Sequence, residues 1–433
     1  MRSRTARGRP HACGLALLLA LGAPPGGALA QAEPDTLRLT LREAVDTALA
    51  RNPTLVVARE QVEQARARVV QATAFPDPTF SAELAGEESL LRPGSNNERN
   101  LALGLTVPFP QKFHLRGEAS RGDLHAAEFG LVQQRQQVAA LTVQAYDALL
   151  VALRHRADLT ESKGLAEDFL RKTEARFEAG TAAKLDVLKA RVEVAAAENG
   201  LIANLRDLTN ARSGLNRLLG RAVGAPVAPA DSLELPAELP PLEPLVAAAH
   251  RARPDLQGLT SQRAGARAAT TLAGQFWMPD LTFGVEKNVL AGTPNSYTSN
   301  VGLTVPLFFW NHRRGEVAES RHREDELAAA YRDLSAQADQ EVRVAYATVV
   351  AALRQARYLR DDLLPEARRA YDIARTSYGL GGSSALEVLD ARRTLLDAEG
   401  QYADALGAAN DARADLERAV GAPLTTVSPG DSR

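Results

Sequence analysis

The sequence Gly104-Leu105-Thr106-Val107-Pro108, followed by Arg116-Gly117-Glu118, returns almost unchanged as Gly302-Leu303-Thr304-Val305-Pro306, followed by Arg314-Gly315-Glu316. The two copies are separated by about 200 residues, close to half of the chain. A period of this length indicates a duplicated structural unit. We therefore expect two halves that contain the same helices and strands in the same order.

The composition favours helices and gives no electrostatic reason for a nucleic-acid partner. The chain has 51 basic and 53 acidic residues, so its charge is nearly balanced. Aromatic residues make up 5% of the chain, and alanine, arginine, leucine and glutamate are abundant, as in long helices. We expect a mostly helical protein that does not bind nucleic acid.

Residues 1–30 have the pattern of an export signal. Four arginines precede an apolar run from Gly14 to Ala23, and Ala28-Leu29-Ala30 resembles a cleavage site. The run is shorter than the roughly 20 apolar residues that a spanning helix needs. We expect cleavage before Gln31 and an exported mature protein.

Metal-binding and catalytic motifs are absent from the sequence. Cys13 lies before the apolar run, so the mature chain would contain no cysteine, and its histidines are scattered without ligand spacing. The sequence contains no G-x-S-x-G, H-E-x-x-H, phosphate-loop or GxGxxG motif. We predict no cofactor, no metal site and no enzymatic activity.

Each half begins with a helix that contains a proline and continues into a β-hairpin. The helices are expected at residues 41–74 and 243–276, with the hairpins at about 78–109 and 280–308. In the second hairpin Val301, Leu303 and Val305 alternate with small or polar residues. Strands of about 9–11 residues match a tilted crossing of a bilayer, although a soluble sandwich would show the same alternation. Since lipid tolerates no open sheet edge, four strands per chain would have to be pooled among several chains.

Each half ends in a long helical hairpin, at about 112–220 and 312–420. No proline interrupts the first helix at 112–178, which would be roughly 100 Å long. The helices are expected to turn at Gly180 and at Gly381. The first unit would therefore cover 31–226, a proline-rich linker 227–242, the second unit 243–421, and a disordered tail 422–433.

The two turns resemble the paired signatures of the TolC-like outer-membrane efflux protein family. The first is Arg176-Phe177-Glu178-Ala179-Gly180-Thr181, leading into Leu185-Asp186-Val187-Leu188-Lys189-Ala190-Arg191. The second is Tyr378-Gly379-Leu380-Gly381-Gly382, leading into Leu386-Glu387-Val388-Leu389-Asp390-Ala391-Arg392. Leu363-Leu364-Pro365-Glu366-Ala367 also resembles this family.

The resemblance implies a mainly helical fold with a small transmembrane β part. Three chains would form a homotrimer, with a twelve-stranded β-barrel in the outer membrane of a Gram-negative cell and a helical α-barrel in the periplasm. The expected function is the channel component of a tripartite efflux system. Its expected partners are outer-membrane lipid, a periplasmic adaptor and an inner-membrane pump, of the RND type.

The resemblance also implies the positions of the gate and of the adaptor-docking tip. Asp186, Tyr378, Glu387 and Asp390 match the gate and constriction positions of the family. Gly180, Thr181, Gly381 and Gly382 match the turns that dock the adaptor. Three copies of a carboxylate around a narrow axis would attract cations. An alternative role for Asp186 and Glu387 is stabilisation of the first helical turn.

The expected cargo is a divalent heavy-metal cation, because Val107-Pro108-Phe109-Pro110-Gln111-Lys112-Phe113 resembles the metal-efflux branch of the family. Drugs or secreted proteins are the alternative cargo. A soluble periplasmic coiled-coil adaptor is a further alternative function, but it would have no use for two bilayer-length hairpins.

Overall fold

The computed structural model describes residues 36–85, 98–290, 292–305 and 313–426. The chain divides into residues 1–35 and a compact unit of residues 36–433, and the description below concerns that unit. The predicted export signal at residues 1–30 lies outside the described residues.

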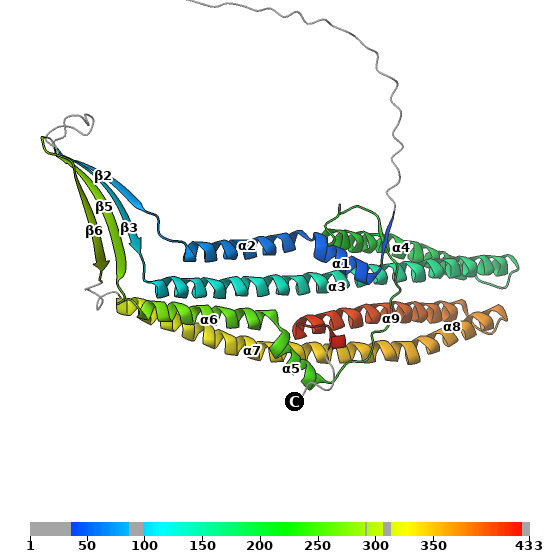
Figure 1. Ribbon diagram of the computed structural model, residues 1–433. Helices are drawn as coiled ribbons and strands as arrows, with labels where there is room; N and C mark the ends of the chain where they lie inside the picture. Colours follow the sequence, from blue (N-terminus) through cyan, green and yellow to red (C-terminus); the bar gives the residue numbers. More distant parts are fainter. Residues whose placement is uncertain (1–35, 86–97, 291, 306–312, 427–433) are drawn as a thin grey trace, which may run out of the picture. The chain divides into compact units, whose positions relative to one another are not determined.

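The two halves of the unit contain corresponding elements in the same order, except that the long helix is continuous in the first half and divided in the second (Figure 1). The first half consists of α1 (Leu41–Arg51), α2 (Pro53–Thr73), β2 (Thr79–Ala85), β3 (Glu98–Val107), α3 (Pro110–Glu178) and α4 (Lys184–Leu218). The second half consists of α5 (Leu242–Ala252), α6 (Pro254–Gly274), β5 (Asp280–Leu290), β6 (Ser296–Thr304), α7 (Arg313–Tyr358), α8 (Leu364–Gly379) and α9 (Ala385–Val420). A π-helical turn, Leu359–Leu363, joins α7 to α8.

The break between the first two helices of each half is stabilised by one buried polar side chain. Asn52 caps α2 by accepting a hydrogen bond from the Thr54 amide at 2.9 Å, and it donates to the Leu218 carbonyl at 2.9 Å. In the second half Arg253 has this position and donates to the Ala419 carbonyl at 3.2 Å. Both side chains therefore bind the break between the two helices to the C-terminal end of the last helix of the same half, which we call the return helix: α4 in the first half and α9 in the second.

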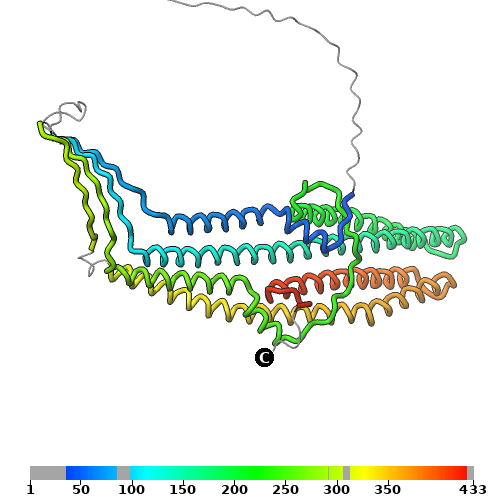
Figure 2. Tube along the Cα trace, in the orientation of Figure 1, coloured from blue at the N-terminus to red at the C-terminus, as the bar shows by residue number. Residues whose placement is uncertain are grey.

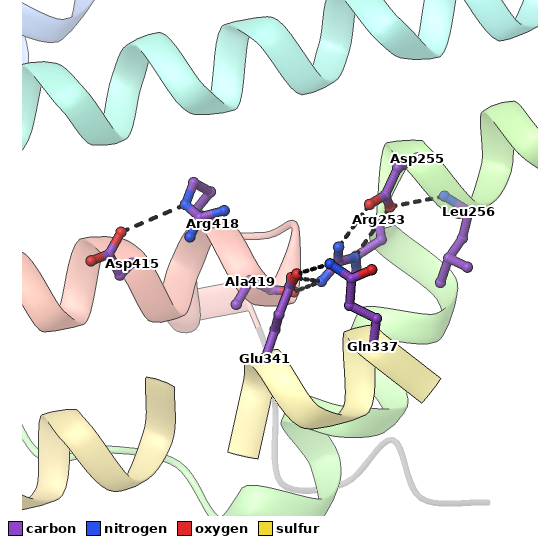
Figure 3. Close-up of polar contacts among 8 residues, drawn as sticks. All are labelled: Arg253, Asp255, Leu256, Gln337, Glu341, Asp415, Arg418 and Ala419. Atoms are coloured by element: carbon purple, nitrogen blue, oxygen red, sulfur yellow. Dashed lines mark hydrogen bonds and ion pairs between the residues drawn. The ribbon is translucent and has the colours of Figure 1, made fainter. Parts of the chain in front are cut away.

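Arg253 also joins α6 to α7 through two carboxylates (Figure 3). Its guanidinium donates to Asp255 at 2.7 Å and to Glu341 at 2.6 Å. Burial opposes the positive charge, but these hydrogen bonds outweigh it and raise the pKa of Arg253. The matching ends of the return helices are thus fixed by an amide in one half and by an ion-pair network in the other.

The four long strands form one antiparallel sheet in the order β2-β3-β5-β6. One face carries Leu103, Phe283, Val285 and Val301, which are 43–74% exposed. The other face carries small and polar residues, as in the pairs Gly104 with Gly284 and Gly284 with Asn300. The two hairpins are therefore joined through β3 and β5, and the joined sheet has an exposed apolar face.

The predicted linker and tail differ from the structure in part. Within the linker β4 (Val227–Pro229) pairs in parallel with β1 (Leu37–Leu39), because Val227 is buried in the first hydrophobic core. Within the tail Leu424–Thr426 form a 3₁₀ turn, and Leu424 is buried in the second core. Residues 427–433 lie outside the described residues.

Each half has its own hydrophobic core where the long helix meets its return helix. Tyr146 and Leu149 pack with Leu215 in the first core, and Val342 and Val349 pack with Leu416 in the second. The apolar stripe that the two long helices share is therefore used for helix packing.

The two halves meet where α3 contacts α6 and α9, as the chain trace also shows (Figure 2). At α6, Gly122 lies against Gly265, and a Cβ on Gly122 would be only 2.7 Å from the Gly265 Cα. At α9, His155 contacts Asp404 at 2.8 Å, and Gln136 donates to the Gly421 carbonyl at 2.7 Å. We call the contact of α3 with α9 the α3/α9 seam.

Candidate functional site

The turn that connects α3 to α4 is closed by a glycine with positive φ. Gly180 has φ = 73°, which an L side chain rarely adopts, and the Thr181 amide donates back to the Arg176 carbonyl at 2.8 Å. At the start of α4 the Asp186 carboxylate accepts from the Ala183 amide at 3.3 Å. Asp186 therefore satisfies a backbone donor at the N-terminus of α4.

The turn that connects α8 to α9 has the same geometry, and the N-terminus of α9 is capped by two side-chain hydrogen bonds. Gly381 has φ = 84°, and the Gly382 amide donates to the Ser377 carbonyl at 2.9 Å. Glu387 accepts from the Ser384 amide at 2.9 Å, while the Ser384 hydroxyl accepts from the Glu387 amide at 3.3 Å. This reciprocal capping box gives Ser384 a role in the turn.

Tyr378 joins the second turn to α3. Its side chain is 7% exposed, and its ring lies 5.3 Å from the Phe169 ring. The Arg176 guanidinium lies 4.5 Å above the Tyr378 ring, and it donates to the Tyr378 carbonyl at 2.6 Å. The Tyr378 hydroxyl is 3.4 Å from the Thr173 hydroxyl. These contacts connect the two helical hairpins close to their turns.

Arg392 makes a second connection, two residues beyond Asp390 on α9. Its side chain is 5% exposed and donates to the Ser162 carbonyl on α3 at 2.7 Å, with Glu193 of α4 at 3.7 Å. Burial lowers the pKa of Arg392, and its Nε has no hydrogen-bond partner in the described part of the chain. The matching Arg191 is exposed and pairs with Glu174 at 2.8 Å within the first hairpin.

An open groove of about 640 Å³ runs between α3 and α8 beside these contacts. Asp168 on its α3 side lies 3.7 Å from Arg375 on its α8 side. The Lys172 ammonium, together with Arg171 and Arg375, lowers the pKa of Asp168. The groove is therefore lined by acidic and basic side chains, and also by the apolar faces of Phe169 and Tyr378.

The four predicted gate residues lie near the two turns, but no hydrogen bond joins any two of them within the described chain. Asp186 and Glu387 act as caps, Tyr378 is buried against α3, and Asp390 is exposed. Asp186 and Glu387 therefore have the alternative role that was expected from the sequence, which is to stabilise the first turn of α4 and of α9.

The contacts that link the two helical hairpins are not among those expected from the sequence. Phe169, Thr173 and Arg176 contact Tyr378, and Arg392 contacts Ser162. An arginine ends both turn motifs, as Arg191 and as Arg392, and this repetition indicates a structural role. It does not indicate the partner, because the two arginines have different partners.

Among the described residues no group of three or more His, Cys, Asp or Glu side chains could hold a metal ion. In the same part of the chain, no helix has the length and apolarity needed to span a bilayer.

Comparison with known proteins identifies the family. The sequence profile of the family described as outer membrane efflux protein matches residues 44–221 and again residues 245–422. The chain is 26% identical to the cobalt-zinc-cadmium resistance protein CzcC of Cupriavidus metallidurans, over 88% of this chain and 90% of that protein. It is 27% identical to the pyoverdine export outer membrane protein OpmQ of Pseudomonas putida, over 94% of this chain and 93% of that protein.

The fold is that of solved outer-membrane channels. The outer-membrane channel OprN superimposes with a TM-score of 0.76 at 21% identity, covering 92% of this chain and 96% of that channel. The family predicted from the two turn motifs is confirmed: the chain belongs to the outer membrane efflux protein family and is an outer-membrane channel component of an efflux system.

Proposed function

We propose that three copies of the chain together form a barrel with a closed wall, and that divalent heavy-metal cations leave the cell through its pore. The observation that supports it best is the four-stranded sheet, which has one exposed apolar face and one polar face. Its strands β3, β5 and β6 are 10, 11 and 9 residues long, the length of a tilted bilayer crossing. The apolar face would contact lipid, and the polar face would line the pore.

The edges of the sheet support assembly of several copies. In the described chain β2 pairs only with β3, and β6 pairs only with β5. An unpaired edge is costly in lipid, because its amides and carbonyls have no water to bind. Pairing β6 of one copy with β2 of the next would satisfy both edges, and three copies would close twelve strands.

The turns at the other end of α3 would form the gate and the docking tip. Glu387 and Asp390 are exposed on the first turns of α9, so three copies would bring six carboxylates around one axis. Asp186 and Tyr378 would hold the hairpins in place around it. Gly180, Thr181, Gly381 and Gly382 would contact a periplasmic adaptor, which would connect the channel to an inner-membrane pump.

The gate can be tested by recording single channels in planar bilayers. Glu387→Gln and Asp390→Asn remove the charges while keeping the shape of the side chains and the acceptor for the Ser384 amide. We expect the double variant to lose most of its preference for cations over anions. Glu366→Gln, on α8 outside the turn, is the control and should behave like the wild type. Unchanged cation selectivity in the double variant would refute the gate.

The cargo can be tested in the native host. Deleting the gene should increase sensitivity to cobalt, zinc and cadmium salts, and the intact gene should restore growth. The similarity to a pyoverdine exporter gives the alternative outcome. Unchanged metal sensitivity, together with retention of an organic compound in the cell, would make that compound the cargo.

A further inference from the structure

The α3/α9 seam contains two acidic side chains that face one another. The helices are antiparallel there: a Cβ on Gly407 would meet Val151, and Asp404 contacts His155. Asp147 lies one turn from Val151, and Asp411 lies one turn from Gly407 in the opposite direction. The register of the seam therefore places Asp147 of the first half against Asp411 of the second.

Neither carboxyl group is neutralised in the seam. Asp147 is 4% exposed, and its Oδ2 has no hydrogen-bond partner in the described chain; the same holds for Oδ1 of Asp411. On α9, Gly407 and Ala414 lie about one turn on either side of Asp411, and both are buried. A buried carboxylate without a partner is strongly disfavoured and takes up a proton instead.

The charged groups around the pair do not supply a counter-charge. Asp411 is the charge that acts on Asp147, and Asp415 is the charge that acts on Asp411. The nearby cations of α9 are paired elsewhere, Arg413 with Glu417 and Arg418 with Asp415. The other helices that contact α3 or α9, which are α1, α2, α4, α5, α6, α7, the π-helical turn and α8, contribute no charge to either carboxyl group among the described residues.

We propose that Asp147 and Asp411 form a proton-binding site between the two helical hairpins, so that the stability of their contact depends on pH. A protonated pair lets α3 and α9 pack closely, whereas two carboxylates would repel each other across a contact in which Asp147 is almost fully buried. The site does not depend on the proposed cargo or on the number of subunits. It rests on the proposed channel function only for its consequence, which is that rising pH would loosen the hairpins that surround the gate.

The direction and range of the effect follow from the protonation equilibria. Burial, reinforced by Asp411, raises the pKa of Asp147 to about 7, and burial, reinforced by Asp415, raises the pKa of Asp411 to about 6. The folded state therefore holds these protons more tightly than the unfolded state, whose carboxyl pKa is about 4. The contribution of these two carboxyl groups to the free energy of unfolding should therefore be largest below pH 4, and it should fall as pH rises from there to about 7.

The test uses the purified full-length protein in detergent, with thermal unfolding followed by circular dichroism from pH 5 to pH 8. We expect the wild type to melt several degrees lower at pH 8 than at pH 5. Asp147→Asn and Asp411→Asn keep the size of the side chains but each removes one titrating group, so each should lose part of the pH dependence, and the double variant should melt at a nearly constant temperature. If their melting temperatures depended on pH as strongly as that of the wild type, the proposal would be wrong.

A control separates this site from another polar contact between α3 and α9. Asp404→Asn changes the contact between His155 and Asp404 but leaves Asp147 and Asp411 in place, so it should keep most of the wild-type pH dependence. Infrared spectroscopy gives a measurement that does not depend on variant folding. The wild type at pH 6 should show the carbonyl band of a protonated carboxyl group, and this band should vanish by pH 8. Absence of the band at pH 6 would overturn the proposal.

Discussion

At the scale of single residues, the matched arginines at the two turns differ in what they stabilise. Arg392 is almost fully buried and connects α9 to α3 and α4, whereas Arg191 is largely exposed and pairs within its own hairpin. Removing one member of a buried polar network leaves the others without partners, which is far more costly than removing an exposed ion pair.

Replacing Arg392 by alanine should therefore destabilise the protein by about 3 kcal/mol. Arg191→Ala is the matched control and should cost less than about 1 kcal/mol. Chemical denaturation of both variants in the same detergent measures the difference. Equal costs for the two substitutions would show that burial of Arg392 contributes nothing to its role.

The sequence predicted the turn residues better than their partners. Gly180 and Gly381 both have positive φ, as a glycine just after a helix suggests. The partner of Tyr378 could not be predicted, because Phe169, Thr173 and Arg176 lie about 200 residues away on another helix and carry no local signal.

At the scale of elements, the long helix α3 carries two glycines with opposite surroundings. Gly122 lies against the backbone of Gly265 and Ser261 on α6, at distances that leave no room for a Cβ. Gly130, two turns further along α3, has no atom within 4 Å of its Cβ position. The first glycine therefore permits close helix contact, whereas the second only lowers helix stability.

Substitution by alanine should have opposite effects at these two positions. Gly122→Ala should destabilise the protein by about 2 kcal/mol, because α3 and α6 must move apart. Gly130→Ala should stabilise it by about 0.5–1 kcal/mol, since alanine is the better helix former. Thermal unfolding of the two variants checks both signs, and a stabilising Gly122→Ala would contradict the close contact.

The π-helical turn marks one place where the two long helices differ in length. Tyr346 follows Tyr146 by 200 positions, but Gly381 follows Gly180 by 201, so the second half has one extra residue between them. Leu359–Leu363 form the π-helical turn within this interval, directly before Pro365. A bond from one residue to the fifth residue before it accommodates one more residue than an α-helical turn does. Pro365 is a local signal in the sequence, whereas the extra residue is visible only when the spacings of the two halves are compared.

Deleting Asp362 should convert the π-helical turn into an ordinary α-helix and leave the folded protein and its melting temperature nearly unchanged. Deletion of Glu161, in the regular middle of α3, is the control. That deletion would rotate the rest of α3 by about 100° relative to its partners, because no wider turn can absorb the change. The control should therefore unfold or aggregate, as seen by circular dichroism and gel filtration. Severe loss of structure in the Asp362 deletion would show that the π-helical turn has another cause.

At the scale of the whole molecule, the order of elements and the family could be predicted from the sequence, whereas the contacts between the halves could not. Pro53, Pro254 and the alternating residues near Val301 mark elements locally. The closeness of Asp147 to Asp411 depends on how α3 lies against α9, and no single stretch of sequence specifies that packing. The linker strand β4 was missed for a similar reason, since its partner β1 lies about 190 residues earlier.

The exposed side of α4 predicts how copies of the chain would assemble. Leu188, Ile202 and Leu205 are 49–70% exposed, whereas the residues at the same positions of α9, Leu389, Ala403 and Leu406, are buried. Leu389 shares a hydrophobic cluster with Phe169 of α3, and Leu406 shares one with Ala356 of α7 and Leu359, whereas no helix of the described chain covers Leu188, Ile202 and Leu205 of α4. A row of large apolar side chains on one helix is typical of a surface that another helix covers. In the proposed trimer that helix would come from the next copy.

Ile202→Glu should therefore prevent assembly, because it places a charge in the centre of this apolar row. Ile202→Leu keeps the apolar contact and should assemble like the wild type. The mass of the protein in detergent, measured by light scattering after correction for bound detergent, separates monomer from trimer. Far-ultraviolet circular dichroism checks that Ile202→Glu keeps its helices. A trimeric Ile202→Glu variant would mean that α4 faces the solvent, and that subunits meet through the sheet edges or another helix instead.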